Sequence, residues 1–592
     1  MPEDGRPPAA ETRAFLGVAQ SLTGRLWQGL PLELERRAEA LAQAAGLPEP
    51  LARVLARRGV VPEAAGAFLS PTLRDLLPDP ARLADAARAA ELLVAAAAAR
   101  ARIAVFADYD VDGACSAALL SDWLAAQGPA PTLYVPDRID EGFGPNPPAM
   151  AALAAEHDLI VTVDCGTVAA EAIAAAGDTP VLVLDHHMGE ETLPPAAAVV
   201  NPNRPDEPGD LGHLCAAGVV FLVLVEANRQ ARAAGRPAPD LMGGLDLVAL
   251  ATVADVAALT GVNRAFVATG LKVMARRGRP GLRALADAAG LGEPPRPYHL
   301  GYLLGPRINA GGRIGRADLG ARLLATADAA EAERLAAELD RLNRERRDLQ
   351  DAVVAEALAQ AEARGLDGPL VWAAGEGWHP GIVGIVAARL KEAAGRPAVV
   401  IGLDRGRGTG SARSVAGVDL GAAVHRLAAE GHLLKGGGHR MAAGLTVAAD
   451  RLEPAMARLA ELLARQGAGA AAARALPLDG ILMPGAATVD LIEMLEHAGP
   501  YGAGAPTPRF ALPGMVVRHA REVGTGHLKL TLGDGAGGRL DAIAFGAMEG
   551  PLGRALSAAK GARFHVAGAL ELNRWNGRTS AQLRLEDAAP AG

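Results

Sequence analysis

The stretch Asp108-Tyr109-Asp110-Val111-Asp112-Gly113 decides the fold of this chain, because it follows an apolar, β-prone run, Ile103–Ala107. The same arrangement of apolar run and aspartate recurs twice downstream, at Leu159–Val163 before Asp164 and at Val181–Leu184 before Asp185. Strands that end in carboxylates place oxygen atoms along one edge of a parallel sheet, where open α/β sheets bind ligands. We therefore predict an α/β fold with an acidic site at that edge.

These acidic segments also predict a metal centre. Asp110 and Asp112 can turn into one crevice, Asp164 can bridge two cations, His186 offers a nitrogen, and Asp255 closes the second position. Such carboxylates would repel one another unless cations lay between them. Oxygen ligands with one imidazole suit Mn²⁺ or Mg²⁺ better than Zn²⁺. Two such ions roughly 3.5–4 Å apart serve phosphodiester hydrolysis. The alternative for any one aspartate at a strand end is a helix N-cap.

Length and composition limit the class of protein. With 592 residues the chain is too long for one core, so three or four domains are expected. Hydrophobic residues make up 50% and aromatic residues only 3%, and we find no run of 18 apolar residues and no signal peptide. The three cysteines, Cys115, Cys165 and Cys215, lack CxxC spacing, which argues against disulfides and structural zinc. We expect a cytoplasmic protein without membrane contact, in which these cysteines are packing residues.

The distribution of charge matters more than its sum. The net charge of −8 is not that of a bulk nucleic-acid binder, but residues 501–592 hold 11 Lys/Arg against 7 Asp/Glu. This local excess predicts nucleic-acid contacts in the last domain.

The pattern of apolar runs predicts five regions. They are an N-terminal helical cap (1–80), a doubly wound parallel sheet (81–327), a long connecting helix (328–365), a smaller α/β domain (366–470) and a C-terminal β-barrel, an OB-fold (471–592). Residues 329–364 contain no Pro or Gly, which favours a single helix, although two helices with a turn near Asn343 are the alternative. The barrel is predicted from six short strands, at 509–512, 515–517, 528–532, 540–545, 564–569 and 581–585.

The motifs resemble those of a known family. The segments at Asp108–Gly113, Val163-Asp164, Asp185-His186-His187 and Ala254-Asp255 are similar to motifs I to IV of the DHH phosphoesterase superfamily. The segments 378–384 (Trp-His-Pro-Gly-Ile-Val-Gly) and 436–444 resemble its DHHA1 domain. With the C-terminal barrel, the order resembles the bacterial 5′-to-3′ exonucleases of this superfamily that are specific for single-stranded DNA.

The resemblance implies roles for the acidic residues. It implies that the metal ligands are Asp110, Asp112, Asp164, His186 and Asp255. It further implies that His187 acts on the scissile phosphate and that Asp185 orients its neighbours. Asp108 is expected to contact the metal ligands without binding the metal itself. One departure is Phe106, which stands where relatives often carry a histidine, so the first metal is expected to have one ligand fewer.

A phosphate site is predicted from glycines and arginines. Gly437 and Gly438 allow backbone amides to approach an anion, and His439 adds a donor. In the exonucleases that the chain resembles, segments similar to 307–313 and 411–414 hold the 5′ phosphate. This resemblance adds Arg138, Arg307, Arg313, Ser411 and Arg413, with Arg316 close to the same glycines. Ala412 stands where the family often has Gly, and interdomain ion pairs are the alternative for the arginines.

Two further aromatic or basic groups are weighed from their sequence context. Trp575, between Arg574 and Arg578 in a predicted hairpin, can stack on a base, although a barrel-lining tryptophan is the alternative. His379 precedes Pro380 and is expected to be a turn residue rather than a catalytic one.

The resemblance predicts a metal-dependent 5′-to-3′ exonuclease that degrades single-stranded DNA to nucleotides in recombination and repair. The first alternative is a phosphodiesterase for short oligonucleotides or cyclic dinucleotides, which would not need the basic barrel. The second is a non-catalytic replication scaffold, which would not need five metal-binding side chains. The expected partners of this predicted monomer are single-stranded DNA, a single-strand-binding protein and a recombination helicase.

Overall fold

The computed structural model describes residues 14–138, 140–207, 209–469, 474–559, 561–575 and 577–591. The chain divides into two compact units. The first combines Met1–Leu77, Ala258–Ala268 and Ala472–Gly592, and the second combines Pro78–Ala257 with Thr269–Ala471. The predicted domain boundaries near residues 80, 327, 365 and 470 stay predictions. No helix in the described ranges is long and apolar enough to cross a membrane.

The second unit contains the predicted parallel sheet. Its strands run in the order β3-β2-β4-β5-β6, and every neighbouring pair is parallel. The strands are β2 (Ile103–Ala107), β3 (Thr132–Tyr134), β4 (Leu159–Val163), β5 (Val181–Leu184) and β6 (Ala198–Val200). Three of them, β2, β4 and β5, have the predicted bounds and are buried along their whole length. Continuous apolar runs of this kind are typical of strands that are covered on both faces.

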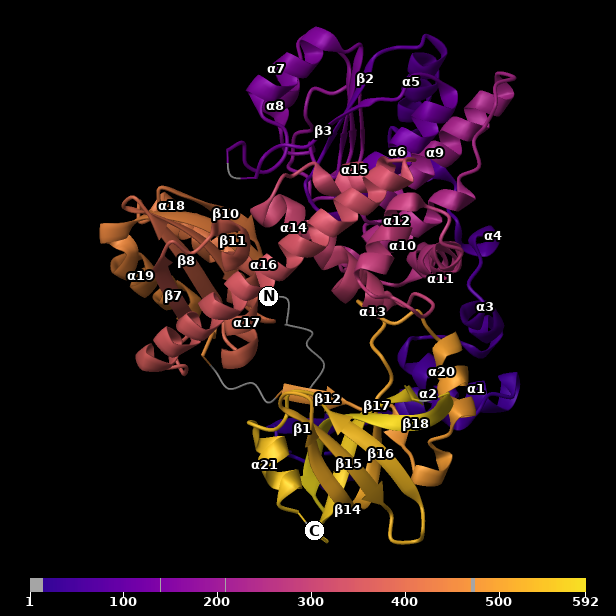
Figure 1. Ribbon diagram of the computed structural model, residues 1–592, viewed down its shortest axis with the longest axis vertical. Helices are drawn as coiled ribbons and strands as arrows, with labels where there is room; N and C mark the ends of the chain where they lie inside the picture. Colours follow the sequence, from indigo (N-terminus) through magenta and orange to yellow (C-terminus); the bar gives the residue numbers. More distant parts are fainter. Residues whose placement is uncertain are drawn as a thin grey trace, which may run out of the picture. The chain divides into compact units, whose positions relative to one another are not determined.

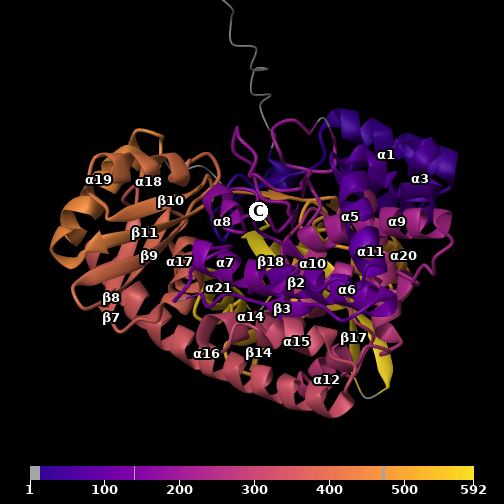
Figure 2. The same cartoon turned by 90° about the horizontal axis from the view of Figure 1, so that it is seen from above.

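Helices cover both faces of this sheet (Figures 1 and 2). On one face α7 (Pro147–Glu156) and α8 (Ala170–Ala174) pack in one core with the sheet residues Phe106 and Ile160. The other face is covered by α5 (Ala86–Ala98), α6 (Val111–Gln127) and α9 (Ala216–Ala233), which contact β6, β2 and β5 respectively. The predicted doubly wound architecture is confirmed.

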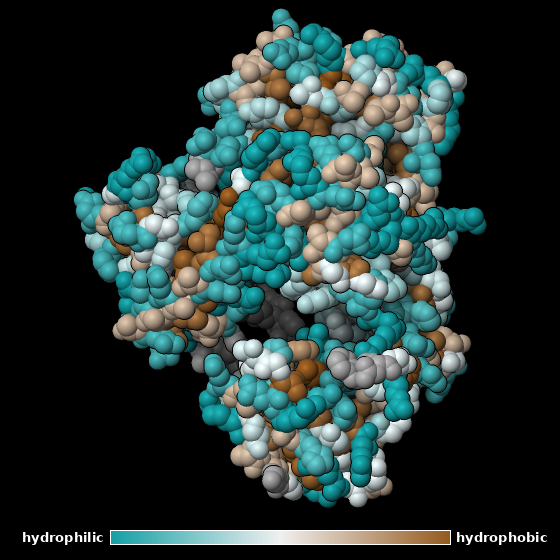
Figure 3. All heavy atoms as spheres, viewed as in Figure 1, coloured by the Kyte–Doolittle hydropathy of each residue, from teal (hydrophilic) through white to brown (hydrophobic). Residues whose placement is uncertain are grey.

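A chain of helices continues from the sheet. It consists of α10 (Leu245–Ala254), α11 (Gly261–Ala275), α12 (Pro280–Ala288), α13 (Pro297–His299), the π-helix η5 (Leu300–Leu304), α14 (Gly305–Ile314) and α15 (Leu319–Ala325). The predicted connecting helix follows as one 36-residue helix, α16 (Ala329–Arg364), capped by the side chain of Asp328. Leu335 and Leu339 lie on its buried side, whereas most of its surface in the space-filling view is hydrophilic (Figure 3).

The smaller α/β domain of this unit has a mixed sheet in the order β10-β11-β9-β8-β7. Its strands are β7 (Val371–Glu376), β8 (Ala398–Asp404), β9 (Arg407–Arg413), β10 (Lys435–His439) and β11 (Ala442–Ala448). Only the β7–β8 pair is parallel. On one face α17 (Pro380–Ala394) packs together with α16, and on the other face lie α18 (Leu420–Ala429) and α19 (Leu452–Ala464).

The first unit contains the predicted barrel. Its five strands are β14 (Phe510–Val523), β15 (His527–Gly533), β16 (Arg539–Ala544), β17 (Arg563–Trp575) and β18 (Arg578–Pro590), and pairing of β14 with β17 closes it. The prediction of six barrel strands is wrong in one respect. The runs at 509–512 and 515–517 belong to the single strand β14, whose register shifts between Leu512 and Met515. Gly514, with φ 61°, makes a bulge there and not a turn.

The N-terminal helices share one core with this barrel, which the sequence did not indicate. The predicted helices are present as α1 (Leu32–Ala45) and α2 (Glu49–Arg57), and their buried side chains join those of β14 to β18 and of α20 (Val489–His497) in one hydrophobic cluster. In addition β1 (Arg25–Gln28) pairs in parallel with β12 (Arg474–Pro477). The indole N–H of Trp27 donates to Asp587 over 2.9 Å. The N-terminal segment therefore folds with the barrel and not as a separate cap.

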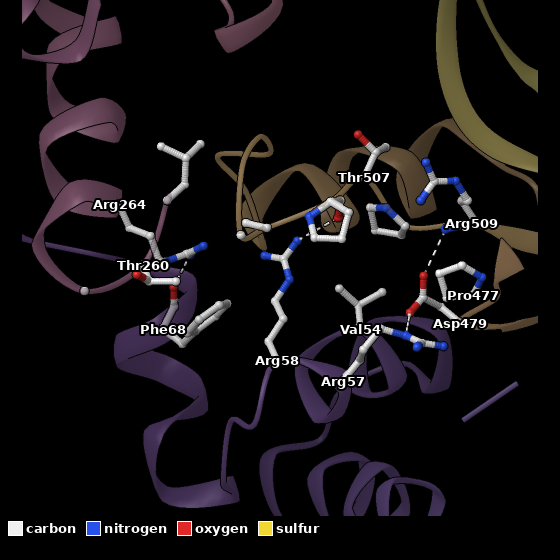
Figure 4. A pocket seen from close by; sticks show the side chains of 16 residues that line it. Val54, Arg57, Arg58, Phe68, Thr260, Arg264, Pro477, Asp479, Thr507 and Arg509 are labelled. Carbon is white, nitrogen blue, oxygen red and sulfur yellow. Dashed lines mark hydrogen bonds and ion pairs between the residues drawn. The ribbon is translucent and has the colours of Figure 1, made fainter. Parts of the chain in front are cut away.

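Two arginines tie distant segments of this unit together (Figure 4). The guanidinium groups of Arg58 and Arg264 both donate to the carbonyl of Ala498, over 2.5 and 3.2 Å. Arg264 also donates to the carbonyl of Phe68 over 2.9 Å and lies 3.8 Å from the centroid of its ring. Burial and the neighbouring charge of Arg58 lower the pKa of Arg264 to about 10. Both side chains line a cavity of about 310 Å³.

We predict that Arg264→Met lowers the stability of this unit. The buried guanidinium satisfies two carbonyl groups from different segments, and hydrogen bonds that involve charged groups contribute about 1.5–3 kcal/mol each. The measurement is the urea midpoint of unfolding, followed by the fluorescence of the tryptophans. Arg521→Met, at an exposed position on β14, is the control and should leave the midpoint unchanged. Equal midpoints for the two variants would contradict a structural role for Arg264.

Candidate metal centre and phosphate site

The first acidic segment forms a sharp turn from β2 into α6. Asp110 is the N-cap of α6, and its Oδ1 accepts the N–H groups of Asp112 and Gly113 over 2.8 and 3.2 Å. The alternative of a helix cap is therefore realised, and among the described residues no hydrogen bond reaches Oδ2, which can serve a cation. A Cβ atom on Gly113 would lie 2.3 Å from the carbonyl oxygen of Asp108, so only glycine allows this close turn.

Two buried carboxylates at this edge of the sheet, one after β2 and one after β4, each have an oxygen without a hydrogen bond. One oxygen of Asp108 and one oxygen of Asp164, both Oδ1, are buried without a hydrogen bond. Oxygens of Asp108, Asp110 and Asp164 lie within 4.8 Å of one another. Burial and the neighbouring negative charges raise the pKa of Asp108 and of Asp164 well above their ordinary range. Orphaned carboxylate oxygens in so small a space fit a divalent cation.

His186 lies at the centre of a second group of ligand atoms. Its Nε2 lies 3.2 Å from Oδ1 of Asp164 and 3.7 Å from Oδ2 of Asp112, and its Nδ1 lies 3.8 Å from Oδ2 of Asp255. Asp255 is the C-cap of α10. Burial and the charges of Asp112 and Asp110 raise the pKa of Asp255 to about 8. The structure thus brings all five predicted ligands together at the carboxyl edge of the sheet.

Asp112 also makes hydrogen bonds to a helix N-terminus, which the sequence did not predict. Its two oxygens accept the N–H groups of Ala216 and Ala217, over 2.6 and 2.8 Å, in the first turn of α9. Negative charge is favourable at a helix N-terminus, so this pairing offsets part of the cost of burying the carboxylate. Asp112 therefore holds α9 against α6 as well as facing His186.

Asp185 and His187 form a hydrogen-bonded pair. Nδ1 of His187 lies 2.8 Å from Oδ1 of Asp185, and Oδ2 of Asp185 accepts the N–H of Thr167 over 3.0 Å. Burial alone would raise the pKa of Asp185, but the bonds from His187 and Thr167 hold it below its ordinary value. Against the effect of burial, the same bond raises the pKa of His187 to about 9. His187 is therefore an oriented cation near neutral pH.

Several residues that contact this pair were not predicted from the sequence. Asn201 donates to Oγ1 of Thr167 and to the carbonyl of His187, each over 2.8 Å. The ring of Phe143 lies edge-on to His187, with centroids 5.6 Å apart, and also contacts Tyr109. No motif pointed to these residues, because only the folded loops bring them to the site.

Phe106, the departure from the family pattern, points into the core. It is fully buried in the cluster with α7 and α8, and its ring stacks on Tyr134 at a centroid distance of 5.2 Å. It therefore offers no ligand atom. Asp108 lies two residues further along the chain with an unpartnered oxygen near Asp110 and Asp164.

A cluster of cations lies on the same unit. Arg138, Arg313 and His379 line one small cavity of about 110 Å³. Burial, the charge of Arg138 and the charge of Arg346 lower the pKa of Arg313 to about 10. Burial and Arg138 also lower the pKa of Arg413 and of His379. An anion bound beside these side chains would offset the repulsion between their positive charges.

Arg346 of α16 belongs to this cluster although its helix was expected only to connect two domains. It is buried, and its Nε makes no hydrogen bond. His379 is the N-cap of α17, where its Nδ1 accepts the N–H of Gly381 over 3.0 Å, so the predicted turn role is confirmed.

The predicted phosphate segments of the smaller sheet meet at neighbouring strand ends. Arg413 at the end of β9 and His439 at the end of β10 both pair with Ala442 of β11. Ser411 lies on β9 two residues before Arg413, and its Oγ is 3.5 Å from the Arg413 guanidinium. Gly437 and Gly438 belong to β10, the edge strand. Gly438 has φ 151°, and a Cβ atom there would lie 2.4 Å from the Cα of Ala443, so glycine is required.

Two of the predicted phosphate-binding arginines are already paired with carboxylates. Arg307 is buried and donates to Asp340 over 2.9 Å and to the carbonyl of Leu303 over 2.7 Å. Arg316 donates to Asp318 over 2.6 Å. The pair of Arg307 with Asp340 on the connecting helix agrees with the interdomain ion-pair alternative, whereas the pair of Arg316 with Asp318 is local. Asn309, on α14 between them, accepts the N–H of Val111 and so fixes α14 to the acidic turn.

The barrel residues singled out from the sequence belong to the first unit. Arg574 and Arg578 are exposed near the ends of β17 and β18, which form one antiparallel hairpin. The side chain of Trp575 lies outside the described residues.

Family models match three parts of the chain. The model of the DHH family, N-terminal domain, matches residues 102–252. The model of the DHHA1 domain matches residues 367–465, and that of the RecJ OB domain matches residues 478–587.

Relatives cover nearly the whole chain. The single-stranded-DNA-specific exonuclease RecJ of Dickeya dadantii is 37% identical over 569 residues, which are 92% of this chain and 96% of the relative. The protein of the same name from Escherichia coli is 34% identical over 584 residues, which are 94% and 99% of the two chains. The crystal structure of RecJ in complex with Mn²⁺ from Thermus thermophilus matches with a TM-score of 0.80 at 32% identity, over 95% of this chain and 79% of that one.

We predict that the metal-free protein loses stability as pH rises. The folded-state pKa of Asp255, about 8, lies above its ordinary value of 3.8, so the folded protein binds this proton more tightly than the unfolded chain does. The resulting penalty is absent below pH ~4, grows up to pH ~8 and is constant above. Thermal midpoints between pH ~5 and ~8, in the presence of a chelator, should therefore fall.

The control for this prediction is Asp255→Asn, which cannot ionise and should show a shallower fall. Saturating Mn²⁺ should raise the wild-type midpoint more at pH ~8 than at pH ~6, because ligands must lose protons before they bind the ion. A rise that is independent of pH would contradict the assignment of these carboxylates as ligands.

Proposed function

Because this chain belongs to the RecJ family of DHH phosphoesterases, we propose that it is a metal-dependent exonuclease that degrades single-stranded DNA from the 5′ end. The observation that carries the proposal is the group of carboxylates Asp108, Asp110 and Asp164 at the sheet edge, in which one buried oxygen of Asp108 and one of Asp164 accept no hydrogen bond. A site of this kind has little use other than holding cations.

The proposed metal ligands are Asp110, Asp112, Asp164, His186 and Asp255. Divalent cations such as Mn²⁺ or Mg²⁺, when bound, supply an activated water and positive charge for the leaving oxygen. The carboxylates keep these ions in place, and His186 lies between the two groups of oxygens because it approaches both Asp164 and Asp255. We add Asp108 as a candidate ligand, since one of its oxygens lies within 4.8 Å of oxygens of Asp110 and Asp164 and its buried Oδ1 accepts no hydrogen bond.

His187 is proposed to bind the scissile phosphate. Asp185 accepts a hydrogen bond from its Nδ1, which fixes the ring and keeps it protonated, with a pKa of about 9. An oriented imidazolium can donate its remaining N–H to an oxygen that gains negative charge in the transition state. We therefore propose Asp185 as a positioning residue, the role that the family resemblance implies.

The polarity of the reaction is proposed to come from the cationic cluster. Arg138, Arg313 and Arg413, together with Ser411 and His439, would hold a terminal 5′ phosphate. Arg138 lies near enough to two of them to act on them electrostatically, since burial and the charge of Arg138 lower the pKa of both Arg313 and Arg413. Backbone amides of Gly437 and Gly438, on the edge strand β10, would complete the site. We do not extend this role to Arg307, whose guanidinium is bound to Asp340.

Single-stranded DNA is the proposed partner of the barrel as well, with contacts from Arg574, Trp575 and Arg578. A role in recombination and repair, the protein partners (a single-strand-binding protein and a recombination helicase), the monomeric state and the cytoplasmic location are further proposals, which rest on the family resemblance alone.

The two alternatives are weaker. A dinucleotide phosphodiesterase needs no basic barrel, and the relatives that cover the barrel are exonucleases by name. A scaffold without catalysis has no reason to retain buried carboxylates that destabilise the metal-free fold.

We predict that Asp164→Asn abolishes hydrolysis while binding of single strands survives. The change removes one negative ligand but leaves the size of the side chain and the cationic cluster unaltered. The assay uses purified protein with Mn²⁺ and end-labelled single-stranded and duplex DNA, with both polarities of label. Wild type should release mononucleotides from the 5′ label of single strands, and Asp164→Asn should retain less than about a hundredth of this rate.

The matched control is Asp404→Asn, an exposed aspartate whose side chain is 84% exposed at the end of β8. It should keep the wild-type rate. Release from the 3′ label first, or a rate for Asp164→Asn close to that of the control, would refute the proposed function.

We also predict that wild type degrades 5′-phosphorylated strands faster than 5′-hydroxyl strands, and that Arg413→Ala reduces this preference. A charge-assisted contact contributes about 1.5–3 kcal/mol, so the preference should fall by roughly 10- to 100-fold. Arg407→Ala, exposed at the opposite end of β9, is the control. A wild-type enzyme that does not distinguish the two ends would exclude the phosphate site.

A further inference from the structure

Two tyrosines without an assigned role form an exposed stack on the second unit. The rings of Tyr298 and Tyr302 lie nearly parallel, at 21°, with centroids 5.2 Å apart. The two residues are 64% and 70% exposed. Large apolar rings that remain in water forgo the free energy of burial, which suggests that a ligand covers them in the working protein.

The stack is held in place by a buried underside. Tyr298 belongs to α13 and Tyr302 to the π-helix η5, and the residues between and after them, Leu300 and Leu304, are almost completely buried. π-Helical turns are rare and occur frequently at functional sites. His299, also buried, caps this element because its Nδ1 accepts the N–H of Arg296 over 3.1 Å. The outer ring faces are therefore presented by a rigid support.

The same helical run leads to the metal centre. A Cβ atom on Gly301 would lie 3.5 Å from Cγ1 of Val253, and one on Gly305 would lie 3.3 Å from the Cβ of Ala254. The π-helix thus lies against the last turn of α10, and the next residue, Asp255, is a proposed metal ligand. Val256, which follows Asp255, is 71% exposed.

The run continues into α14, which also belongs to the proposed site (Figure 1). Asn309 of α14 holds the acidic turn through the N–H of Val111, and Arg313 lies in the cationic cluster. The tyrosine stack, the metal centre and the phosphate site are therefore placed by one continuous element, from α13 to α14, within one unit.

We propose that Tyr298 and Tyr302 form a stacking platform for a base of the single strand whose 5′ end occupies the metal centre. The inference rests on the proposed function and adds a binding site that no motif assigned. A flat pair of rings matches the π-face that every nucleobase offers, and stacking on an aromatic side chain contributes roughly 1–3 kcal/mol per base without selecting a sequence.

The experiment measures binding of the full-length protein to 5′-phosphorylated oligonucleotides in the presence of a chelator, with 2-aminopurine placed at one position after another. The test variant is Tyr298→Leu/Tyr302→Leu, and Tyr298→Phe/Tyr302→Phe is the matched control, because it keeps both rings. For wild type and the control, stacking should quench the probe at one or two adjacent positions. The leucine variant should lose this quenching and bind roughly 5- to 100-fold more weakly.

A second arm replaces the base at the quenched position by an abasic site. Wild type should then bind this strand as weakly as the leucine variant binds the intact strand, and the two losses should not add, because both remove the same contact. Wild-type affinity and quenching in the leucine variant, or additive losses, would overturn the proposal. Loss of a protein partner without loss of DNA affinity would overturn it too, in favour of protein docking.

Hydrolysis is measured separately, on short 5′-phosphorylated strands with Mn²⁺. The leucine variant should cleave them, since neither tyrosine is a proposed ligand. If wild type failed to cleave any strand, the proposed function would fail, whereas quenching in the presence of chelator would still test the platform.

Discussion

The repulsion between buried carboxylates at the sheet edge is the constraint on which the rest of this structure depends. Asp108 and Asp164 are each buried with one oxygen that accepts no hydrogen bond. Burial raises the pKa of both, and so do neighbouring carboxylates: Asp110 for Asp108, and Asp112 and Asp110 for Asp164. The fold holds them there with a turn that only Gly113 permits and with the α9 amides that bind Asp112. The free energy that this arrangement costs without metal is the same free energy that a bound cation recovers.

A complementary cluster of opposite sign lies on the same unit. The fold places Arg138 near Arg313 and Arg413 although their like charges repel one another. Arg346 of the long helix adds an Nε that makes no hydrogen bond. Each cluster is electrostatically incomplete in the absence of ligands. A strand with a 5′ phosphate and bound cations would complete both at once, which couples metal binding to DNA binding. In the proposed phosphate site, Arg346 would make the connecting helix α16 part of the site and not merely a spacer.

The first unit is organised by a different interaction. The N-terminal helices and the C-terminal barrel, separated by some 400 residues of sequence, share one hydrophobic core, and Arg58 and Arg264 join it to the segment Ala258–Ala268. This segment begins three residues after Asp255. The barrel therefore cannot be removed without exposing the apolar side of α1 and α2, so the two ends of the chain are expected to unfold together.

The sequence by itself determined the local features of this protein. It determined β2, β4 and β5 and the long helix, and it pointed to the five residues proposed as ligands, because buried strands, uninterrupted helices and turn glycines leave short-range patterns. Only the tertiary structure decided the contacts between residues far apart in the chain. Long-range packing produces four of these features: the Arg307–Asp340 pair, the common core of the two chain ends, the hydrogen bonds between Asp112 and α9, and the tyrosine stack. No local sequence pattern predicts such packing. The strand 510–523 was wrongly predicted as two strands, because a glycine such as Gly514 between apolar runs is typical of a turn. In the closed barrel this glycine makes a bulge within one strand.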